Sequence, residues 1–323
     1  MLEELKMLDT VDLRFSQDGL FILNIAIAFI MFGVALGIKT KNFVEVFKSP
    51  GSVIIGFISQ FVLLPALTFI IVVSFRNYIT PSVGLGMILV ASCPGGNISN
   101  FMSSLSKGNA ALSVSLTAIA TMGAVLLTPL NFAIYGGWFT KIIHSSDAAG
   151  LLRPLEIDPV EMFKAVLILL GIPLILGMSF NTKFPLTTDK LIKPMQILSI
   201  VLFIAMVAIM FRNNYDFFLR HIKFIFIVVL IHNGLAFLTG YLFSTLTRRS
   251  RFDRRAITIE TGIQNSGLGL VLLFNPKIFP PDLELGGMAF IAAWWGIWHI
   301  LSGLSLAGTL SFIPLPEKES DHI

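Results

Sequence analysis

The sequence predicts an all-α polytopic membrane protein with about nine transmembrane helices arranged as inverted repeats. Three observations predict this class. Hydrophobic residues make up 55% of the 323 residues and charged residues only 13%, whereas soluble domains carry about 25% charged residues. The mean hydropathy is +0.83. Two of the apolar segments contain polar and helix-breaking residues at membrane depth, which is typical of the binding sites of secondary transporters.

Nine apolar segments are long enough to cross a bilayer, which takes about 20 residues in a helix. We expect them at 19–38, 50–74, 82–106, 109–138, 159–180, 192–212, 222–245, 256–275 and 285–312. One transmembrane domain therefore covers 19–312, between an N-terminal arm at 1–18 and a tail at 313–323. The arm is highly charged and has neither the basic start nor the apolar centre of a signal peptide.

The basic residues indicate the orientation in the membrane. Five of the 23 lysines and arginines lie in the loop TRRSRFDRR at 247–255, and cytoplasmic loops are enriched in such residues. With nine spans in the cell (inner) membrane, we expect the N-terminus outside and the tail in the cytoplasm. This clustering accounts for the net charge of +4 and the pI of about 9.2 without a nucleic-acid partner.

The third and eighth spans are the two interrupted ones. The third contains the run CPGGN at 93–97, and the eighth contains the run ETGIQNSGLG at 260–269. A repeat of five spans reverses its topology, so we expect inverted repeats at about 19–138 and 159–312, the first without its opening helix. The connection at 136–159 is expected to be the hinge between the halves.

Glu260 is the strongest candidate for a functional residue. A charged side chain inside a bilayer costs roughly 2.5–3.5 kcal/mol on insertion scales, and intramembrane acids are functional sites by default. The alternative is a structural carboxylate paired with Arg254 or Arg255. On a continuous helix Gln264, at i+4, faces the same way. Carboxylate and carboxamide oxygens suit a hard cation.

Other polar side chains in the apolar segments are candidate ligands. Ser113 and Thr117 lie at i and i+4, close in sequence to Ser99 and Asn100. Their hydroxyls alternatively bond back to their own helix. Gln60 stands alone in an apolar run, where a hydrogen bond between helices is as good an explanation as a ligand role.

Several other functions lack their motifs. His232 and His299 have no further ligands at the spacing of a zinc site, so we expect core histidines. Neither Ser103 nor Ser113 sits in a G-x-S-x-G elbow, and there is no Walker-type phosphate loop. We therefore do not expect an enzyme or an ATP-driven pump. An intramembrane enzyme or a channel is the less favoured alternative to a transporter.

Four motifs together resemble the bile acid:sodium symporter family. They are CPGGNISNFMSSLSKGNAALSVSLT at 93–117, ETGIQNSG at 260–267, GFISQFVLLP at 56–65 and WHILSG at 298–303. The resemblance extends from about residue 20 to 312. It implies a panel domain and a core domain, ten helices in two inverted repeats, and two discontinuous helices that cross beside two sodium ions. Against that pattern we expect the first of the ten helices to be missing here, which removes a panel helix and leaves the core motifs.

The resemblance also implies the ligands. The first sodium ion is expected at Ser99, Asn100, Ser113, Thr117 and Glu260. The second is expected at Gln60, Glu260, Gln264 and the backbone oxygens of Thr261 and Ile263. The substrate is expected at Asn97 and Asn265, with His299 nearby.

The implied function is sodium-coupled import of an organic anion, bile-acid-like or a small carboxylate, by alternating access. The alternative is a proton-coupled transporter in which Glu260 carries a proton instead of binding sodium. The expected partners are the anion, the sodium ions and the lipid bilayer. Nothing in the sequence specifies an oligomeric state.

Overall fold

The computed structural model describes residues 2–9, 50–146, 158–212, 215–275, 278–279 and 284–315, with short stretches between 25 and 38. Within these residues the structure is helical and has no strands, as predicted. Five of its helices are long and apolar enough to cross a membrane: Pro50–Ser74, Ala110–His144, Val160–Lys183, Ile222–Leu246 and Gly286–Phe312. The predicted span at 19–38 is described only in part, so the number of nine spans stays a prediction.

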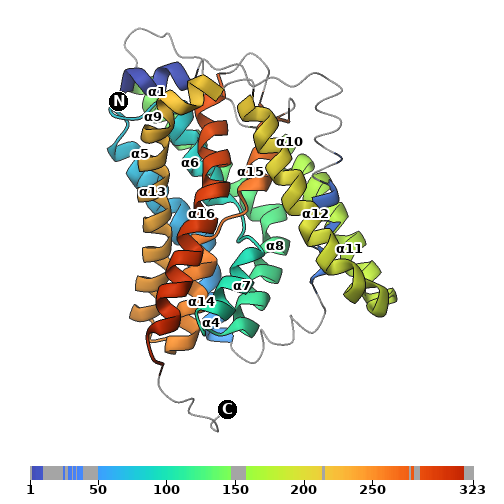
Figure 1. The fold of residues 1–323 in the computed structure, drawn as a ribbon. Coiled ribbons are helices and arrows are strands. Elements are labelled where there is room, and N and C mark those ends of the chain that lie inside the picture. The colour runs from blue at the N-terminus through green and yellow to red at the C-terminus, as the bar shows by residue number, and fades with distance from the viewer. Residues whose placement is uncertain are drawn as a thin grey trace.

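The same order of elements occurs twice along the chain. In the first half, a long helix (α4, Pro50–Ile58; η1, Ser59–Leu63; α5, Leu64–Ser74) precedes the broken pair α6 (Pro81–Ser92) and α7 (Ile98–Leu105), and a second long helix follows (α8, Ala110–Asn131; η2, Phe132–Gly136; α9, Gly137–Ser146). In the second half, the order is α13 (Tyr215–Leu246), the broken pair α14 (Arg251–Gly262) and α15 (Ser266–Leu273), and α16 (Gly286–Phe312). The two broken pairs run in opposite directions (Figure 1), as an inverted repeat requires.

We call these two sets of helices, from α4 to α9 and from α13 to α16, the core. A second group of helices lies beside the core. It comprises α10 (Pro159–Val166), η3 (Leu167–Gly171), α11 (Ile172–Lys183) and α12 (Pro185–Arg212), on the right in Figure 1. The elements α10 and η3 pack against α8, whereas α11 packs against η3 and α12. This division matches the expected core and panel.

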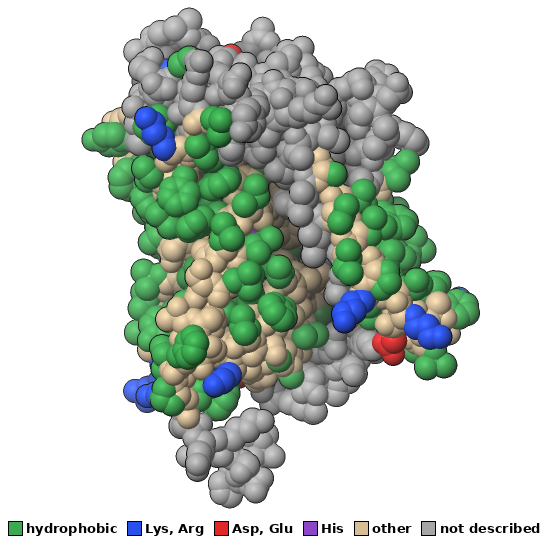
Figure 2. Space-filling view, in the orientation of Figure 1, with side chains coloured by type: hydrophobic (Ala, Val, Ile, Leu, Met, Phe, Trp, Pro, Cys, Tyr) green, Lys and Arg blue, Asp and Glu red, His purple; other side chains and the backbone are tan. Residues whose placement is uncertain are grey.

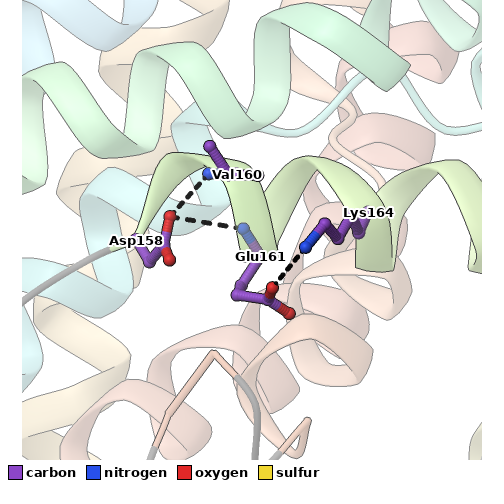
Figure 3. Close-up of polar contacts among 4 residues, drawn as sticks. All are labelled: Asp158, Val160, Glu161 and Lys164. Atoms are coloured by element: carbon purple, nitrogen blue, oxygen red, sulfur yellow. Dashed lines mark hydrogen bonds and ion pairs between the residues drawn. The ribbon is translucent and has the colours of Figure 1, made fainter.

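The start of α10 is fixed by local polar contacts (Figure 3). Asp158 Oδ1 accepts hydrogen bonds from the backbone nitrogens of Val160, at 2.8 Å, and Glu161, at 3.4 Å. Such a cap satisfies N–H groups that have no partner inside the helix. Lys164 Nζ lies 2.6 Å from Glu161 Oε1 one turn further on. Both residues are partly exposed, so this ion pair contributes little to stability.

Several of the predicted boundaries differ from the structure. The helices α12 and α13 begin at 185 and 215, each seven residues before the predicted apolar segment. The predicted hinge at 136–159 begins as helix, because α9 continues to Ser146, and 147–157 lie outside the described residues. Hydropathy detects the part of a helix that is apolar, whereas the backbone hydrogen bonds continue into the polar interface.

Prolines lie close to all three π-helical segments of the described chain. Pro65 follows η1, Pro129 precedes η2 and Pro173 follows η3. A proline removes the N–H that would bond to the carbonyl four residues earlier. For Pro65 that carbonyl belongs to Phe61, and Asn131 Nδ2 donates to it at 2.8 Å instead. A side chain of α8 thus stabilises η1, the π-helical turn that contains Gln60.

The outer surface is that of a membrane protein. Figure 2 shows hydrophobic side chains over the middle of the molecule and basic side chains near its ends. Large apolar side chains such as Ile70, Leu126, Ile175 and Leu242 are exposed, which is expected where lipid covers the surface. Inside, α6 and α16 approach closely, because a Cβ atom on Gly86 would lie 2.8 Å from Met288 Cα.

The N-terminal helix α1 (Leu2–Asp9) covers one end of the core (Figure 1). It packs against α6, α13 and α16, and the side chains of Leu5 and Leu8 are fully buried. Asp9 Oδ1 accepts a hydrogen bond from Thr80 Oγ1 at 3.0 Å. Thr80 caps α6, and Gly287 in the first turn of α16 also hydrogen-bonds to Asp9. A carboxylate is stabilising at helix N-termini.

Asp253 makes the corresponding contacts at the other end of the core. It accepts hydrogen bonds from Ser52 Oγ at 2.7 Å and from Asn109 Nδ2 at 2.8 Å. Asn109 caps α8, and Asp253 itself lies in the first turn of α14. Each end of the core therefore has one carboxylate between the start of the broken pair of one half and the start of the long helix that follows the broken pair of the other half. In the second half this carboxylate comes from α14, and in the first half it comes from α1.

Candidate functional site

The two broken pairs cross through their non-helical segments. Gly95 and Gln264 form an antiparallel bridge. On either side, Gly96 N donates to Ile263 O at 2.8 Å and Asn265 N donates to Pro94 O at 2.7 Å. Backbone groups released by the helix breaks therefore satisfy one another, as burial in a membrane protein demands. Two helix C-termini, of α6 and α14, and two helix N-termini, of α7 and α15, meet here.

Glu260 lies next to this crossing and is 1% exposed. Its carboxylate accepts three hydroxyl hydrogen bonds from the first half of the chain. Ser99 Oγ and Ser113 Oγ donate to Oε2 at 2.5 and 3.2 Å, and Thr117 Oγ1 donates to Oε1 at 2.7 Å. The predicted ligands of the first sodium ion thus come together from α7, α8 and α14.

Glu260 has no basic partner among the described residues. Arg255, one of the two alternatives, donates instead to the carbonyls of Ser106 and, at 2.8 Å, Ile313. Lys164 pairs with Glu161 instead, at 2.6 Å, far from this site in sequence. The structural pairing with Arg254 or Arg255 is therefore wrong for the described structure. A buried carboxylate without a counter-charge is costly, and a bound cation would remove that cost.

The oxygen atoms around Glu260 outnumber the hydrogens available to them. The single hydrogen of Thr117 Oγ1 has three acceptors within reach: Glu260 Oε1 at 2.7 Å, Ser113 O at 3.0 Å and Asn100 Oδ1 at 3.1 Å. It can be donated to one of them at a time. The remaining lone pairs of these oxygens have no hydrogen to accept, and oxygen ligands are those that hard cations take. These residues fit a sodium ion.

Two side chains predicted for the second site, Gln60 and Gln264, also lie at the crossing. Gln60 and Gln264 are fully buried, and Gln60 Nε2 and Gln264 Oε1 have no hydrogen-bond partner among the described residues. A Cβ atom on Gly95 would overlap Glu260 Oε1 and lie 3.2 Å from Gln60 Nε2. Gln60 therefore lies close to Glu260, and an unsatisfied Gln264 oxygen beside them fits a second cation.

The predicted reason for the position of Gln264 is wrong, although the residue lies at the crossing. The helix α14 ends at Gly262, so Gln264 is not one helical turn beyond Glu260. It lies in the extended segment, where its Nε2 donates to Thr261 O at 2.7 Å. The helix ends at a glycine, and the residues after it pair with the first break. The i+4 spacing of a continuous helix therefore does not apply to Gln264.

Two of the three predicted substrate residues lie at helix N-termini. Asn97 precedes α7 and Asn265 precedes α15. Asn265 Oδ1 accepts from Leu268 N at 3.1 Å, so the group it can offer to a substrate is its amide N–H. His299 is buried in α16, and its Nδ1 has no hydrogen-bond partner in the described chain. No direct contact joins His299 to either asparagine among the described hydrogen bonds.

His232 behaves as the predicted core histidine. Its Nε2 lies 2.8 Å from Thr68 Oγ1, and its ring lies edge-on to Trp295 with 4.7 Å between centroids. The sequence analysis missed its neighbour Asn233, which donates to Gly262 O at 2.7 Å. It also missed Asn131. The signal was present, because both are amides within apolar runs, as Gln60 is.

Comparison with known proteins agrees with this architecture. The model of the sodium bile acid symporter family matches residues 24–221, more than half of the chain. The chain belongs to this family. An uncharacterized sodium-dependent transporter of Bacillus subtilis is 32% identical over 303 residues, which cover 91% of this chain and 86% of the relative. The predicted family is thereby confirmed.

Two eukaryotic relatives of this symporter family are also similar. The human ileal sodium/bile acid cotransporter is 26% identical, over 86% of this chain and 78% of the relative. A probable chloroplastic sodium/metabolite cotransporter of Oryza sativa subsp. japonica is 29% identical, over 84% of this chain and 63% of the relative. The family and these names are those of multi-pass membrane transporters rather than enzymes.

Proposed function

We propose that the protein is a symporter that couples the entry of two sodium ions to the import of one small organic anion. The observation that carries this proposal is Glu260, a buried carboxylate with hydroxyl and amide oxygens around it and no basic partner in the part of the chain that the structure describes. Family membership and the names of the relatives support sodium coupling.

Both ions share Glu260 in this proposal. The first is held with the side chains of Ser99, Asn100, Ser113 and Thr117, and the second with those of Gln60 and Gln264 and the carbonyls of Thr261 and Ile263. Each of these two carbonyls accepts one hydrogen bond in the structure, from Gln264 Nε2 and Gly96 N. A carbonyl oxygen has a second lone pair, which remains for the ion.

The anion binds at the N-termini of α7 and α15. Each helix N-terminus carries about half a positive charge and unpaired N–H groups, which favour an anionic group. The amides of Asn97 and Asn265 add donors, and His299 lies on the neighbouring helix α16. The crossing segments contain no arginine or lysine, so they lack the bidentate partner that suits phosphate. A carboxylate or sulfonate with an apolar body fits best.

Sodium binding links the two substrates. Residues of the crossing segments belong to both sodium sites. Bound sodium therefore holds the backbone of these segments in place, together with the helix N-termini that face the anion. The core then moves against the panel and exposes the sites to the cytoplasm. Import follows from an inward sodium gradient, because the anion moves in the same direction as the sodium ions.

Uptake into proteoliposomes tests the proposal. Radiolabelled carboxylates and sulfonates should accumulate under an inward sodium gradient and not under a potassium gradient of equal ionic strength. Glu260→Ala should abolish accumulation, whereas Glu161→Ala, at an exposed acid in α10, should not. Accumulation driven equally by a proton gradient without sodium would instead support the proton-coupled alternative.

Asn265→Ala separates anion binding from sodium binding. The substitution removes an amide donor and the α15 cap, so KM for the anion should rise about tenfold. Sodium-dependent thermal stabilisation should persist, because Asn265 is not a proposed sodium ligand. Unchanged anion KM in this variant would contradict the proposed pocket.

A further inference from the structure

Three carbonyl groups at and just beyond the broken end of α14 accept hydrogen bonds from the crossing segments. A helix end leaves its last four carbonyls without intrahelical donors. Here Ile259 O accepts from Ile263 N, Thr261 O accepts from Gln264 Nε2, and Ile263 O accepts from Gly96 N. These donors all belong to the crossing segments. The carbonyl of Gly262 is different, because its donor comes from another helix.

That donor is Asn233 on α13. Its Nδ2 lies 2.7 Å from Gly262 O, and the side chain is 1% exposed. Its Oδ1 accepts from Ser302 Oγ of α16 at 2.6 Å. A carbonyl only accepts, so the atom facing Gly262 O must be the amide nitrogen. Both ends of the Asn233 amide are therefore satisfied, and its orientation is fixed.

The same face of α13 holds the end of α14 at close range. Phe237, one turn beyond Asn233, lies so near Gly262 that a Cβ atom there would overlap its ring. Gly240 lies a further turn along, and a Cβ atom on it would lie 2.9 Å from Ile257 O and from Thr261 Oγ1. The spacing i, i+4, i+7 places these three residues on one stripe.

We propose that Asn233 is a positioning residue for the second sodium site. Gly262 stands between Thr261 and Ile263, whose carbonyls are the proposed backbone ligands of that ion. The hydrogen bond from Asn233 fixes the Gly262 peptide and thereby the two carbonyls on either side of it. Ser302 acts one step further away, through Asn233. This inference rests on the sodium sites of the proposed function.

Sodium titration of the purified protein by thermal unfolding tests the role, with potassium replacing sodium at constant ionic strength. Asn233→Leu keeps the size of the side chain and removes the donor. It should raise the half-saturating sodium concentration about tenfold, the effect of losing one buried hydrogen bond. Ser302→Ala leaves the donor in place but frees its orientation, and should raise that concentration about threefold.

Asn181→Leu is the matched control. Asn181 is a buried amide of α11 that donates to Leu36 O at 2.8 Å, away from the crossing. This variant should lower the melting temperature without changing the half-saturating sodium concentration. A merely structural role for Asn233 would give the same result as the control, and that result would overturn the inference.

Two further outcomes are distinguishable. A wild-type protein whose melting temperature responds equally to sodium and potassium would contradict the proposed function itself. A wild-type protein that responds to sodium, with Asn233→Leu and Ser302→Ala titrating like wild type, would contradict the role of Asn233 alone. Should Asn233→Leu fail to fold, Ser302→Ala decides by its sodium KM in transport, which should rise while kcat changes less.

Discussion

At the residue scale, the site depends on how closely other groups pack around the carboxylate of Glu260. Glu260 receives hydroxyl groups from two helices of the other half of the chain, and its remaining side is met by the backbone of Gly95. Only a residue without a side chain fits there. The carboxylate of Glu260 in the second break thus leaves room only for a glycine at position 95 in the first break. The two halves of the chain are in direct contact at this point.

Gly95→Ala should disturb sodium binding more than folding. The added methyl group overlaps Glu260 Oε1, and such overpacking typically costs about 1–3 kcal/mol. We expect the half-saturating sodium concentration in thermal unfolding to rise about tenfold or more. Gly137→Ala is the control, because a Cβ atom there meets nothing within 4 Å. Equal sodium titrations of the two variants would show that Gly95 does not shape the site.

Much of the candidate site could be predicted at this scale, and the reason is the cost of polar groups in a membrane. Glu260, Gln60, Ser113 and Thr117 stand out because apolar runs surround them. Local spacing predicted that Ser113 and Thr117 share a face, and both donate to Glu260. Spacing failed for Gln264, where the helix had already ended. The role of Asn233 depends on a contact between α13 and α14 that no local pattern contains.

At the element scale, α1 is a short helix held by a buried acid. Desolvation by burial raises the pKa of Asp9 from 3.8 to about 7, and the negative charge of Glu284 adds to the rise, while hydrogen bonds from Thr80, Gly287 and Ser82 oppose it. The helix has eight residues and is too short to span a membrane. Its attachment to the core therefore depends on pH through Asp9.

The sign follows from the two states of Asp9. Released into water, the carboxyl has its ordinary pKa of 3.8; docked, it has a pKa of about 7. The docked state binds the proton more tightly, so docking is favoured in acid and weakens as pH rises from about 4 to about 7. A spin label on Met7→Cys should be less mobile at pH 5 than at pH 8. Asp9→Asn should remove this difference, and a persistent difference in that variant would exclude Asp9 as its cause.

The helices themselves were largely predictable, whereas their ends were not. The apolar segments at 50–74 and 285–312 match helices within a residue. Both breaks were predicted from prolines and glycines beside polar residues. The π-helical turns were not, because a proline shows only that one carbonyl loses its donor. The helix can kink, it can widen, or the free carbonyl can accept a hydrogen bond from a side chain such as Asn131. Which of these occurs depends on the neighbouring helices.

At the scale of the whole molecule, opposite ends of the core should face opposite sides of the membrane. The start of α14 lies at one end and the connection before α16 lies at the other (Figure 1). On a Cys93→Ala background, Arg251→Cys and Glu284→Cys should react with an impermeant thiol reagent from opposite sides. Both native side chains are exposed, whereas Phe279 in the same connection is buried and unsuitable. Labelling from one side would refute the topology.

The attachment of α1 has a consequence for following transport. This helix packs against α6, α13 and α16, which all belong to the core. At acidic pH, where Asp9 keeps it docked, the helix should travel with the core on the proposed outer face, while Val160 at the exposed start of α10 stays with the panel. Fluorophores attached at positions 7 and 160 would therefore report each transport cycle as a change in energy transfer. Neither position lies in the binding site.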